Sequence, residues 1–338
     1  MRSATAWLVG LCALAMAGLS ATSSAAPTKL TYSVFFPATH KNTLLATEWA
    51  REVEKRTNNA VQITVFPGGT LTPADKCYDG VEQGISDIGM SVLGYTRGRF
   101  PLSEVLDLPL GCRTGVTATG MVNAFHEKFA PKEFGGTQIM YLHAHGPGLL
   151  HTKKPVRKLE DLKGMKIRCT GLAAKSVTAL GGTPVAMSMG ETYDSLNRGV
   201  VDGSMAPMES LEGWRWGEVV KYTTEDHGAA YTTTFFVTMN KAKWNSLSAD
   251  VRKVMAEVNA EWAERTGKAW DAMDQSGRDF VTKRGNEIIS LSAEENARWA
   301  EAVKPLLTEY AAKMKEKGLP GEEAVAFCQD YLKKHQEP

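Results

Sequence analysis

Strand and helix patterns alternate along the first two thirds of this 338-residue chain, and that alternation constrains its fold more than any other feature. Residues 30–36 and 61–66 are short apolar runs typical of strands, and the segment between them carries Leu45, Trp49 and Val53 at a spacing of four. A spacing of four puts these side chains on one face of a helix. Strand–helix–strand order calls for a right-handed crossover between parallel strands, so the sequence predicts an α/β protein.

The same order recurs further along the chain and predicts two doubly wound halves. In the first half, a helix over 73–83 precedes a strand over 87–92, and in the second half a strand ending at Arg168 precedes a helix near 173–180. Ligands of such sheets bind beyond the carboxyl ends of the strands. We therefore expect a ligand cleft between the two halves.

The final third changes character and is dominated by one long helical pattern. Ser248 caps this pattern, which reaches roughly Lys283. A helix of about 36 residues spans about 54 Å, longer than one small domain, so we expect it to cross both halves. The predicted organisation is a signal segment, 1–25, a first α/β domain, 26–150 with about 240–275, and a second α/β domain with the C-terminal helices, 151–239 with about 276–338.

The N-terminal segment is typical of a secretory signal peptide. Arg2 precedes an apolar run over 7–19, and Ser23-Ser24-Ala25 supplies small residues at the spacing that cleavage requires. We expect cleavage after Ala25 and a periplasmic location. No later segment approaches 18 consecutive apolar residues, so the mature chain is not expected to span a membrane.

Charge argues against a nucleic-acid partner or an anionic membrane surface. Cleavage removes one of the 39 basic residues, Arg2, and leaves 38 basic residues against 38 acidic ones. A net charge near zero provides no electrostatic attraction to either partner.

Four cysteines remain after cleavage, and their role is left open by the sequence. They are Cys77, Cys112, Cys169 and Cys328, and their spacing matches no zinc pattern. An oxidising compartment permits one bridge, for which Cys77 with Cys112 is the favoured pair. Free buried thiols are the alternative.

Catalytic, cofactor and metal motifs are missing from the sequence. It contains no Gly-x-Ser-x-Gly, Walker loop, His-Glu-x-x-His or dinucleotide glycine fingerprint. His143 and His145 form an i, i+2 pair without an identifiable third metal ligand. We therefore expect no cofactor, no metal and no enzymatic activity.

Of Trp214 and Trp216, one is expected in the core and the other at a surface or cleft.

Arg168 is the residue that most constrains function. It ends the apolar run Gly164-Met165-Lys166-Ile167-Arg168, which is typical of a buried strand. A guanidinium keeps its proton and is costly to bury without an anion. Two partners satisfy this requirement: an acidic side chain of the same protein, or a bound anionic ligand.

Six fragments, in this order, resemble the extracytoplasmic solute-binding proteins of tripartite ATP-independent periplasmic (TRAP) transporters, the DctP type. The fragments are Glu52-Val53-Glu54-Lys55-Arg56-Thr57-Asn58, Pro67-Gly68-Gly69 after a strand, Gly84-Ile85-Ser86-Asp87-Ile88-Gly89, Leu159-Glu160-Asp161-Leu162-Lys163-Gly164-Met165-Lys166-Ile167-Arg168, Gly199-Val200-Val201-Asp202-Gly203 and Met239-Asn240-Lys241-Ala242-Lys243-Trp244. The resemblance covers about two thirds of the chain.

This resemblance implies a two-domain periplasmic binding protein-like (type II) fold with a hinge. It also implies a receptor that closes over a small organic anion and delivers it to the membrane subunits of a TRAP transporter. Such a receptor makes and breaks no covalent bond of its ligand. The arginine that corresponds to Arg168 pairs with the solute carboxylate in that family. The alternatives are the ligand-binding component of a periplasmic sensor system, and a sulfonate in place of the carboxylate.

Other family ligand positions transfer to this chain by their place in the motifs. The solute-binding residues expected beside Arg168 are Asn240, Tyr95, Met189, His40, His145, Phe235, Phe236, Ala206 and Glu209. Ala206 stands before Pro207 where a common family pattern has a polar Asn, and Ala206 cannot hydrogen-bond through its side chain. The pocket is therefore expected to suit a compact or partly apolar acid, such as an aromatic or hydroxy acid, better than a sugar acid. We expect a monomer.

Overall fold

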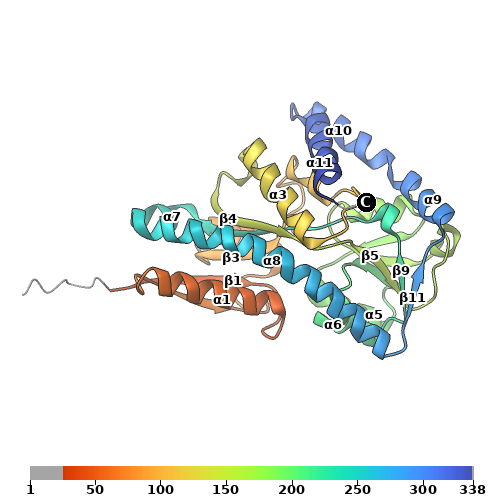
Figure 1. The fold of residues 1–338 in the computed structure, drawn as a ribbon, viewed down its shortest axis with the longest axis horizontal. Coiled ribbons are helices and arrows are strands. Elements are labelled where there is room, and N and C mark those ends of the chain that lie inside the picture. The colour runs from red at the N-terminus through yellow and green to blue at the C-terminus, as the bar shows by residue number, and fades with distance from the viewer. Residues whose placement is uncertain (1–25, 337–338) are drawn as a thin grey trace, which may run out of the picture.

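The computed structural model describes residues 26–336, so the predicted signal peptide, 1–25, lies outside the described residues. Two β-sheets, each covered by helices, form two lobes of a mixed α/β fold (Figure 1). The helices are α1 (Lys41–Arg56), α2 (Cys77–Glu82), α3 (Gly115–Phe129), α4 (Ala173–Ala179), α5 (Met189–Arg198), α6 (Ser210–Gly213), α7 (Lys241–Ser246), α8 (Ala249–Lys283), α9 (Ala293–Val303), α10 (Pro305–Glu316) and α11 (Gly321–His335).

The first sheet has the strand order β2-β1-β3-β10-β4. Its strands are β1 (Thr28–Val34), β2 (Val61–Phe66), β3 (Ile88–Val92), β4 (Thr137–Ala144) and β10 (Thr234–Asn240). β1 pairs with β2 and β3 in parallel, as the strand–helix–strand pattern predicts. β10 runs antiparallel between β3 and β4, because the chain enters it on returning from the second lobe. The predicted α/β fold is therefore confirmed, and one antiparallel strand, β10, is inserted between β3 and β4 of this sheet.

The second sheet has the order β11-β9-β5-β8-β6-β7 and is also mixed. Its strands are β5 (Leu149–Thr152), β6 (Lys166–Cys169), β7 (Thr183–Ala186), β8 (Gly203–Ala206), β9 (Tyr222–Glu225) and β11 (Glu287–Ser290). β6 pairs in parallel with β7 and β8, whereas β5 runs antiparallel to β8 and β9. β6, the strand that carries Arg168, is therefore an interior strand of this sheet.

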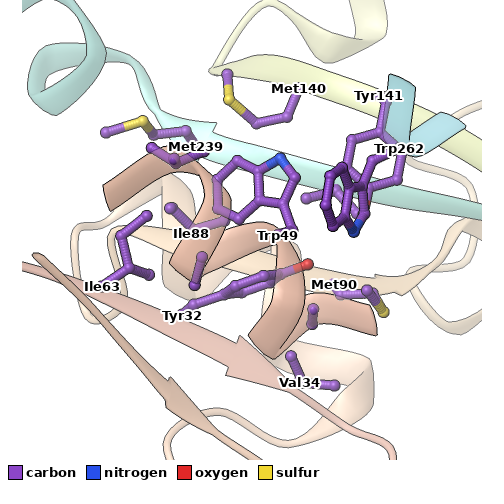
Figure 2. Packing of buried hydrophobic residues seen from close by; sticks show 14 of the residues in the cluster. Tyr32, Val34, Trp49, Ile63, Ile88, Met90, Met140, Tyr141, Met239 and Trp262 are labelled. Carbon is purple, nitrogen blue, oxygen red and sulfur yellow. The ribbon is translucent and has the colours of Figure 1, made fainter. Parts of the chain in front are cut away.

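The core of the first lobe lies between its sheet and the helices α1 and α8 (Figure 2). Tyr32 of β1 and Trp49 of α1 meet edge to face, with ring centroids 5.6 Å apart. The indole of Trp49 donates to Asn259 Oδ1 at 3.0 Å, and the indole of Trp262 donates to the Leu45 carbonyl at 2.8 Å. The buried indoles thus find polar partners, and these bonds fix α1 against α8.

The predicted long helix is confirmed: α8 has 35 residues and begins after Ser248, whose side chain accepts from Val251 N. At 1.5 Å per residue it is about 52 Å long. It packs against α1 and α3 in the first lobe and against α6 in the second, and Figure 1 shows it running across the molecule. One helix therefore spans both lobes.

The predicted domain boundaries remain predictions, and sheet membership adds two details to them. β10 belongs to the first sheet, so the strand that contains 234–239 lies with the first lobe, whereas the prediction placed it in the second domain. α11 packs against α3 of the first lobe, although the prediction grouped the C-terminal helices with the second domain. Non-local pairing of this kind leaves no trace in local sequence patterns.

The cysteines of the described residues, Cys77, Cys112, Cys169 and Cys328, are buried and free. Cys77 and Cys112 both belong to the apolar cluster that surrounds α3, where burial raises the pKa of each thiol to about 12. Within 26–336, no helix combines the length and the apolar character needed to cross a bilayer.

Candidate ligand-binding site

A narrow cavity lies between the two lobes, at the carboxyl ends of β1, β3, β6 and β8. Both lobes contribute to its wall. The first lobe supplies Phe35, Phe36, Val92, Tyr95, His145 and Phe235, and α8 adds Trp270. The second lobe supplies Arg168, Thr170, Met189, Ala206, Pro207, Glu209, Trp214 and Tyr231. Thr233 lies on a connection between the lobes.

Arg168 is the cation of the cavity wall. Its side chain is 1% exposed, and both Nε and Nη2 donate to the Met187 carbonyl, at 3.1 and 2.9 Å. The guanidinium also lies 5.7 Å from the ring centre of Trp216. Within the described part of the chain, no carboxylate forms an ion pair with Arg168, and Nη1 donates to no protein acceptor. A buried charge therefore lacks its anion.

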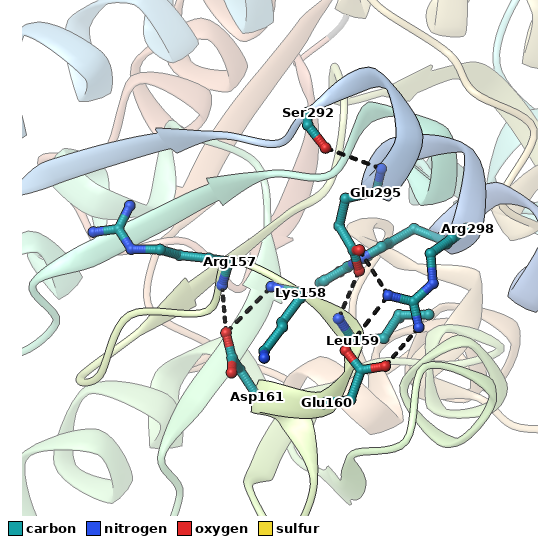
Figure 3. Close-up of polar contacts among 9 residues, drawn as sticks. Arg157, Lys158, Leu159, Glu160, Asp161, Ser292, Glu295 and Arg298 are labelled. Carbon is teal, nitrogen blue, oxygen red and sulfur yellow. Dashed lines mark hydrogen bonds and ion pairs between the residues drawn. The ribbon is translucent and has the colours of Figure 1, made fainter.

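The turn before β6 is anchored on α9 by a network of polar contacts (Figure 3). Glu295 accepts from the Leu159 backbone N–H at 2.8 Å, and Arg298 bridges Glu295 and Glu160 at 2.8 and 2.6 Å. Asp161 caps the same turn by accepting from the backbone of Arg157 at 2.8 Å. This anchoring holds the strand that follows, and with it Arg168, in place.

Tyr95 crosses from the first lobe to the second. Its hydroxyl oxygen accepts from the Met189 backbone N–H at 2.9 Å and from Arg168 Nη2 at 3.5 Å. Burial raises the pKa of Tyr95 above its ordinary value, so the phenol keeps its proton at neutral pH. Because the oxygen only accepts from the protein, this proton is available to an anion beside Arg168.

Aromatic rings cover much of the remaining wall. Phe35 stacks on Phe36 with centroids 4.2 Å apart, and Phe35 lies nearly parallel to Phe235 and Trp214 at 6.4 and 6.2 Å. Trp270 of α8 approaches Phe235 at 5.1 Å. Such a wall favours a flat apolar group over one with several hydroxyls.

The histidines near the cavity are held neutral by burial. Burial lowers the pKa of His145 to about 4, and its Nδ1 donates to the Gly146 carbonyl at 2.6 Å. Burial likewise lowers the pKa of His143 to about 3; that ring stacks on Phe235 at 4.7 Å and does not line the cavity. Neither histidine adds a positive charge to that of Arg168 at neutral pH.

His40 and Glu209 form a second contact between the lobes. His40 Nε2 lies 2.5 Å from Glu209 Oε1, and both side chains are buried. His40 Nδ1 accepts from Asn42 N at 3.2 Å, which caps α1. The proton of the ring is therefore on Nε2 and is donated to Glu209.

The structure brings together most of the residues expected from the sequence. Those that line the cavity are Arg168, Tyr95, Met189, His145, Phe235, Ala206 and Glu209, and His40 adjoins it through Glu209. Trp214 lines the cavity and Trp216 is buried in the core, as expected of that pair.

The placement of Phe236 and Asn240 is corrected by the structure. Neighbouring residues of β10 point to opposite faces of the sheet, so Phe235 faces the cavity while Phe236 packs on Tyr78 at 5.5 Å. The Asn240 side chain caps α7 by accepting from Lys243 N and donates to the Val81 carbonyl. Its role is therefore structural.

Sequence reasoning missed Phe35, Phe36 and Trp270. The two phenylalanines follow the carboxyl end of β1, and that position is the signal from which they could have been predicted as cleft residues. Trp270 lies on the apolar face of α8, and its spacing does not distinguish a residue of the core from one that lines a cavity.

Two lobes that enclose a cavity with one unpaired cation define a class of protein: receptors that bind a small anion between two domains. The model of the bacterial extracellular solute-binding protein family 7, DctP, matches residues 32–314. The chain belongs to this family, whose members are the non-enzymatic, periplasmic solute receptors of TRAP transporters. Such receptors bind small organic anions and work with TRAP membrane subunits.

Relatives and solved structures agree with this assignment. The C4-dicarboxylate-binding periplasmic protein DctP of Rhodobacter capsulatus is 30% identical, over 91% of this chain and 93% of the relative. A marine-metagenome TRAP solute-binding protein specific for aromatic acids, in complex with 3-hydroxybenzoate, has a TM-score of 0.88 at 28% identity, over 93% of this chain and all of the other. A Bordetella bronchiseptica TRAP protein with bound mandelate has a TM-score of 0.85 at 29% identity, over 91% and 99%.

Proposed function

We propose that this protein is the receptor through which a TRAP transporter takes up a small aromatic carboxylate, and that Arg168 binds the carboxylate. The observation that carries the proposal is the buried guanidinium of Arg168, which has no acidic partner among the described residues and lines a cavity walled by aromatic rings.

Arg168 and Tyr95 together form a suitable carboxylate receptor. Arg168 Nη1 and the Tyr95 hydroxyl proton are both without a protein acceptor within 26–336, and the two side chains meet at 3.5 Å. A carboxylate has two oxygens, so it can accept from both groups at once. Each charge-assisted hydrogen bond stabilises the complex by about 1.5 to 3 kcal/mol.

The wall favours an aromatic acid over a sugar acid. Ala206 presents only a methyl group, and Phe35, Trp214 and Phe235 present ring faces. Two of the structural relatives carry 3-hydroxybenzoate and mandelate, and a third, from Rhodoferax ferrireducens, carries copurified benzoate. A polyhydroxylated solute would leave hydroxyl groups unpaired against these rings.

Binding couples to closure because each lobe supplies part of the site. Arg168 belongs to the second lobe, whereas Tyr95 and Phe35 belong to the first, so an open form offers the solute only half of its contacts. The solute stabilises the closed form by the difference between its affinities for the two forms. The closed receptor is then the species presented to the membrane subunits.

Calorimetry with benzoate, benzenesulfonate and galacturonate tests the proposal. We expect benzoate to bind and Arg168→Lys to weaken it at least tenfold, about 1.4 kcal/mol, because lysine keeps the charge but loses the planar fork. Lys166→Ala is the matched control, since Lys166 is an exposed cation on the same strand. Tighter binding of benzenesulfonate would make the solute a sulfonate, and unchanged affinity in Arg168→Lys and Arg168→Ala would remove Arg168 from the site.

A further inference from the structure

We infer that Glu209 selects among aromatic acids: the receptor takes a solute with one carboxylate and a hydroxyl that donates to Glu209, and it rejects acids with a second carboxylate. This inference rests on the proposed function, because it assumes that the solute carboxylate binds Arg168.

Glu209 is a buried acceptor in the same cavity as Arg168. It follows β8, is 2% exposed and lines the cavity wall. Its Oε1 accepts from His40, and no protein donor contacts Oε2 among the described residues. Glu209 also borders an outer recess with Lys41 and Arg215, but neither cation forms an ion pair with it in the part of the chain described; Arg215 pairs with Glu218.

The residues around Glu209 leave one of its carboxyl oxygens without a donor. His40 donates through Nε2 to Glu209 Oε1, while its Nδ1 accepts from Asn42 N. Asp274 accepts from the Glu209 backbone N–H at 2.9 Å, and burial raises the pKa of Asp274 to about 8. Asp274 therefore keeps its proton at neutral pH and adds no second negative charge.

A continuous row of rings connects Arg168 with Glu209. Tyr95, which contacts Arg168, meets Phe35 at 5.8 Å; Phe35 stacks on Phe36, and Phe36 meets His40 at 4.3 Å. His40 in turn bonds Glu209. Because Arg168 and Glu209 line the same cavity, a flat solute with its carboxylate on Arg168 can present its other edge to Glu209.

The charges of the cavity then decide which acids fit. Arg168 compensates one carboxylate, and a second carboxylate near Glu209 would place two like charges in a site with little water. A hydroxyl at that edge instead donates to a carboxylate that otherwise lacks a donor. Sites built around such a bond discriminate strongly against analogues without the hydroxyl.

The test is calorimetry of benzoate, 3-hydroxybenzoate and isophthalate at pH 7.5, with the full-length mature receptor. For the unmodified protein we expect 3-hydroxybenzoate to bind about tenfold more tightly than benzoate, and isophthalate at least a hundredfold more weakly. Glu209→Gln should reduce the preference for 3-hydroxybenzoate and improve isophthalate at least tenfold. Glu212→Gln is the matched control, because Glu212 borders only the outer recess.

Ratios between ligands are the readout, because Glu209→Gln also alters the contact with His40 and so changes all affinities together. Equal affinities for the three acids in the unmodified protein would overturn this inference and leave the proposed function intact, as would ratios that Glu209→Gln does not change. Failure of all three acids to bind would overturn the proposed function, and this inference with it.

Discussion

At the scale of single residues, Arg168 links the sequence to the site. The sequence alone required an anion near a guanidinium at the end of a buried strand, and it left two partners open. The structure provides no acidic partner among the described residues, and it directs two of the guanidinium nitrogens to the Met187 carbonyl. The sequence could not assign residues such as Phe35 to the cavity wall, because apolar rings occur both in protein cores and in cavity walls.

Tyr95 provides the test at this scale. Tyr95→Phe removes the hydroxyl that we expect to donate to the solute, and the Met189 backbone N–H loses its acceptor. We expect affinity for benzoate to fall by roughly tenfold, about 1 to 2 kcal/mol, with little change in the melting temperature of the free protein.

Tyr193→Phe is the matched control for that substitution, because the Tyr193 hydroxyl bonds Glu218 outside the cavity. Equal affinities of the Tyr95→Phe variant and the unmodified protein, measured by calorimetry, would exclude Tyr95 from the carboxylate site.

At the scale of elements, the lobes meet where two glycines allow close approach. A Cβ on Gly94, at the carboxyl end of β3, would lie 3.0 Å from Gly171 Cα, just after β6.

Sequence patterns predicted β1, β2, β3, α8 and the strand that ends at Arg168, because these segments have clear local periodicity. They could not predict that β10 lies between β3 and β4, since that order depends on contacts between residues far apart in the chain.

Gly94→Ala should therefore oppose closure without unfolding either lobe. The added methyl group meets backbone, which cannot rotate away as a side chain would. We expect roughly tenfold weaker binding of benzoate and, at equal saturation, a larger radius of gyration in small-angle scattering. Gly190→Ala is the control, because a Cβ there meets no atom within 4 Å. If the two variants bind alike, the approach of Gly94 to Gly171 does not limit closure.

At the scale of the whole molecule, four connections join the lobes within 26–336: the segment 146–148, the segment 232–233, α8, and α10, which leads from α9 on the second lobe to α11 on the first. Several separate connections permit rotation about a hinge but restrict other motions, unlike a single flexible linker.

Buried carboxyls also make the stability of the whole fold depend on pH. Burial raises the pKa of Asp226 to about 7, so its folded form binds a proton that the unfolded form releases near pH 4.

The free energy of unfolding should therefore fall as pH rises from about 4 to about 7, at up to about 1.4 kcal/mol per pH unit from this group. Asp226→Asn removes the titrating proton and keeps an oxygen that can accept from Leu150 N. Urea unfolding at pH 5, 6 and 7 should show a difference in stability, variant minus unmodified protein, that grows with pH. A difference that stays constant would mean that Asp226 is ionised in the folded protein.

The central claim, that an aromatic carboxylate is bound by Arg168 between the lobes, is tested most directly by a crystal structure with benzoate. The account predicts the carboxylate oxygens within hydrogen-bonding distance of Arg168 and of the Tyr95 hydroxyl, with the ring against Phe35 and Phe235. A benzoate bound away from Arg168, with the guanidinium still bonded only to Met187 and Tyr95, would contradict it.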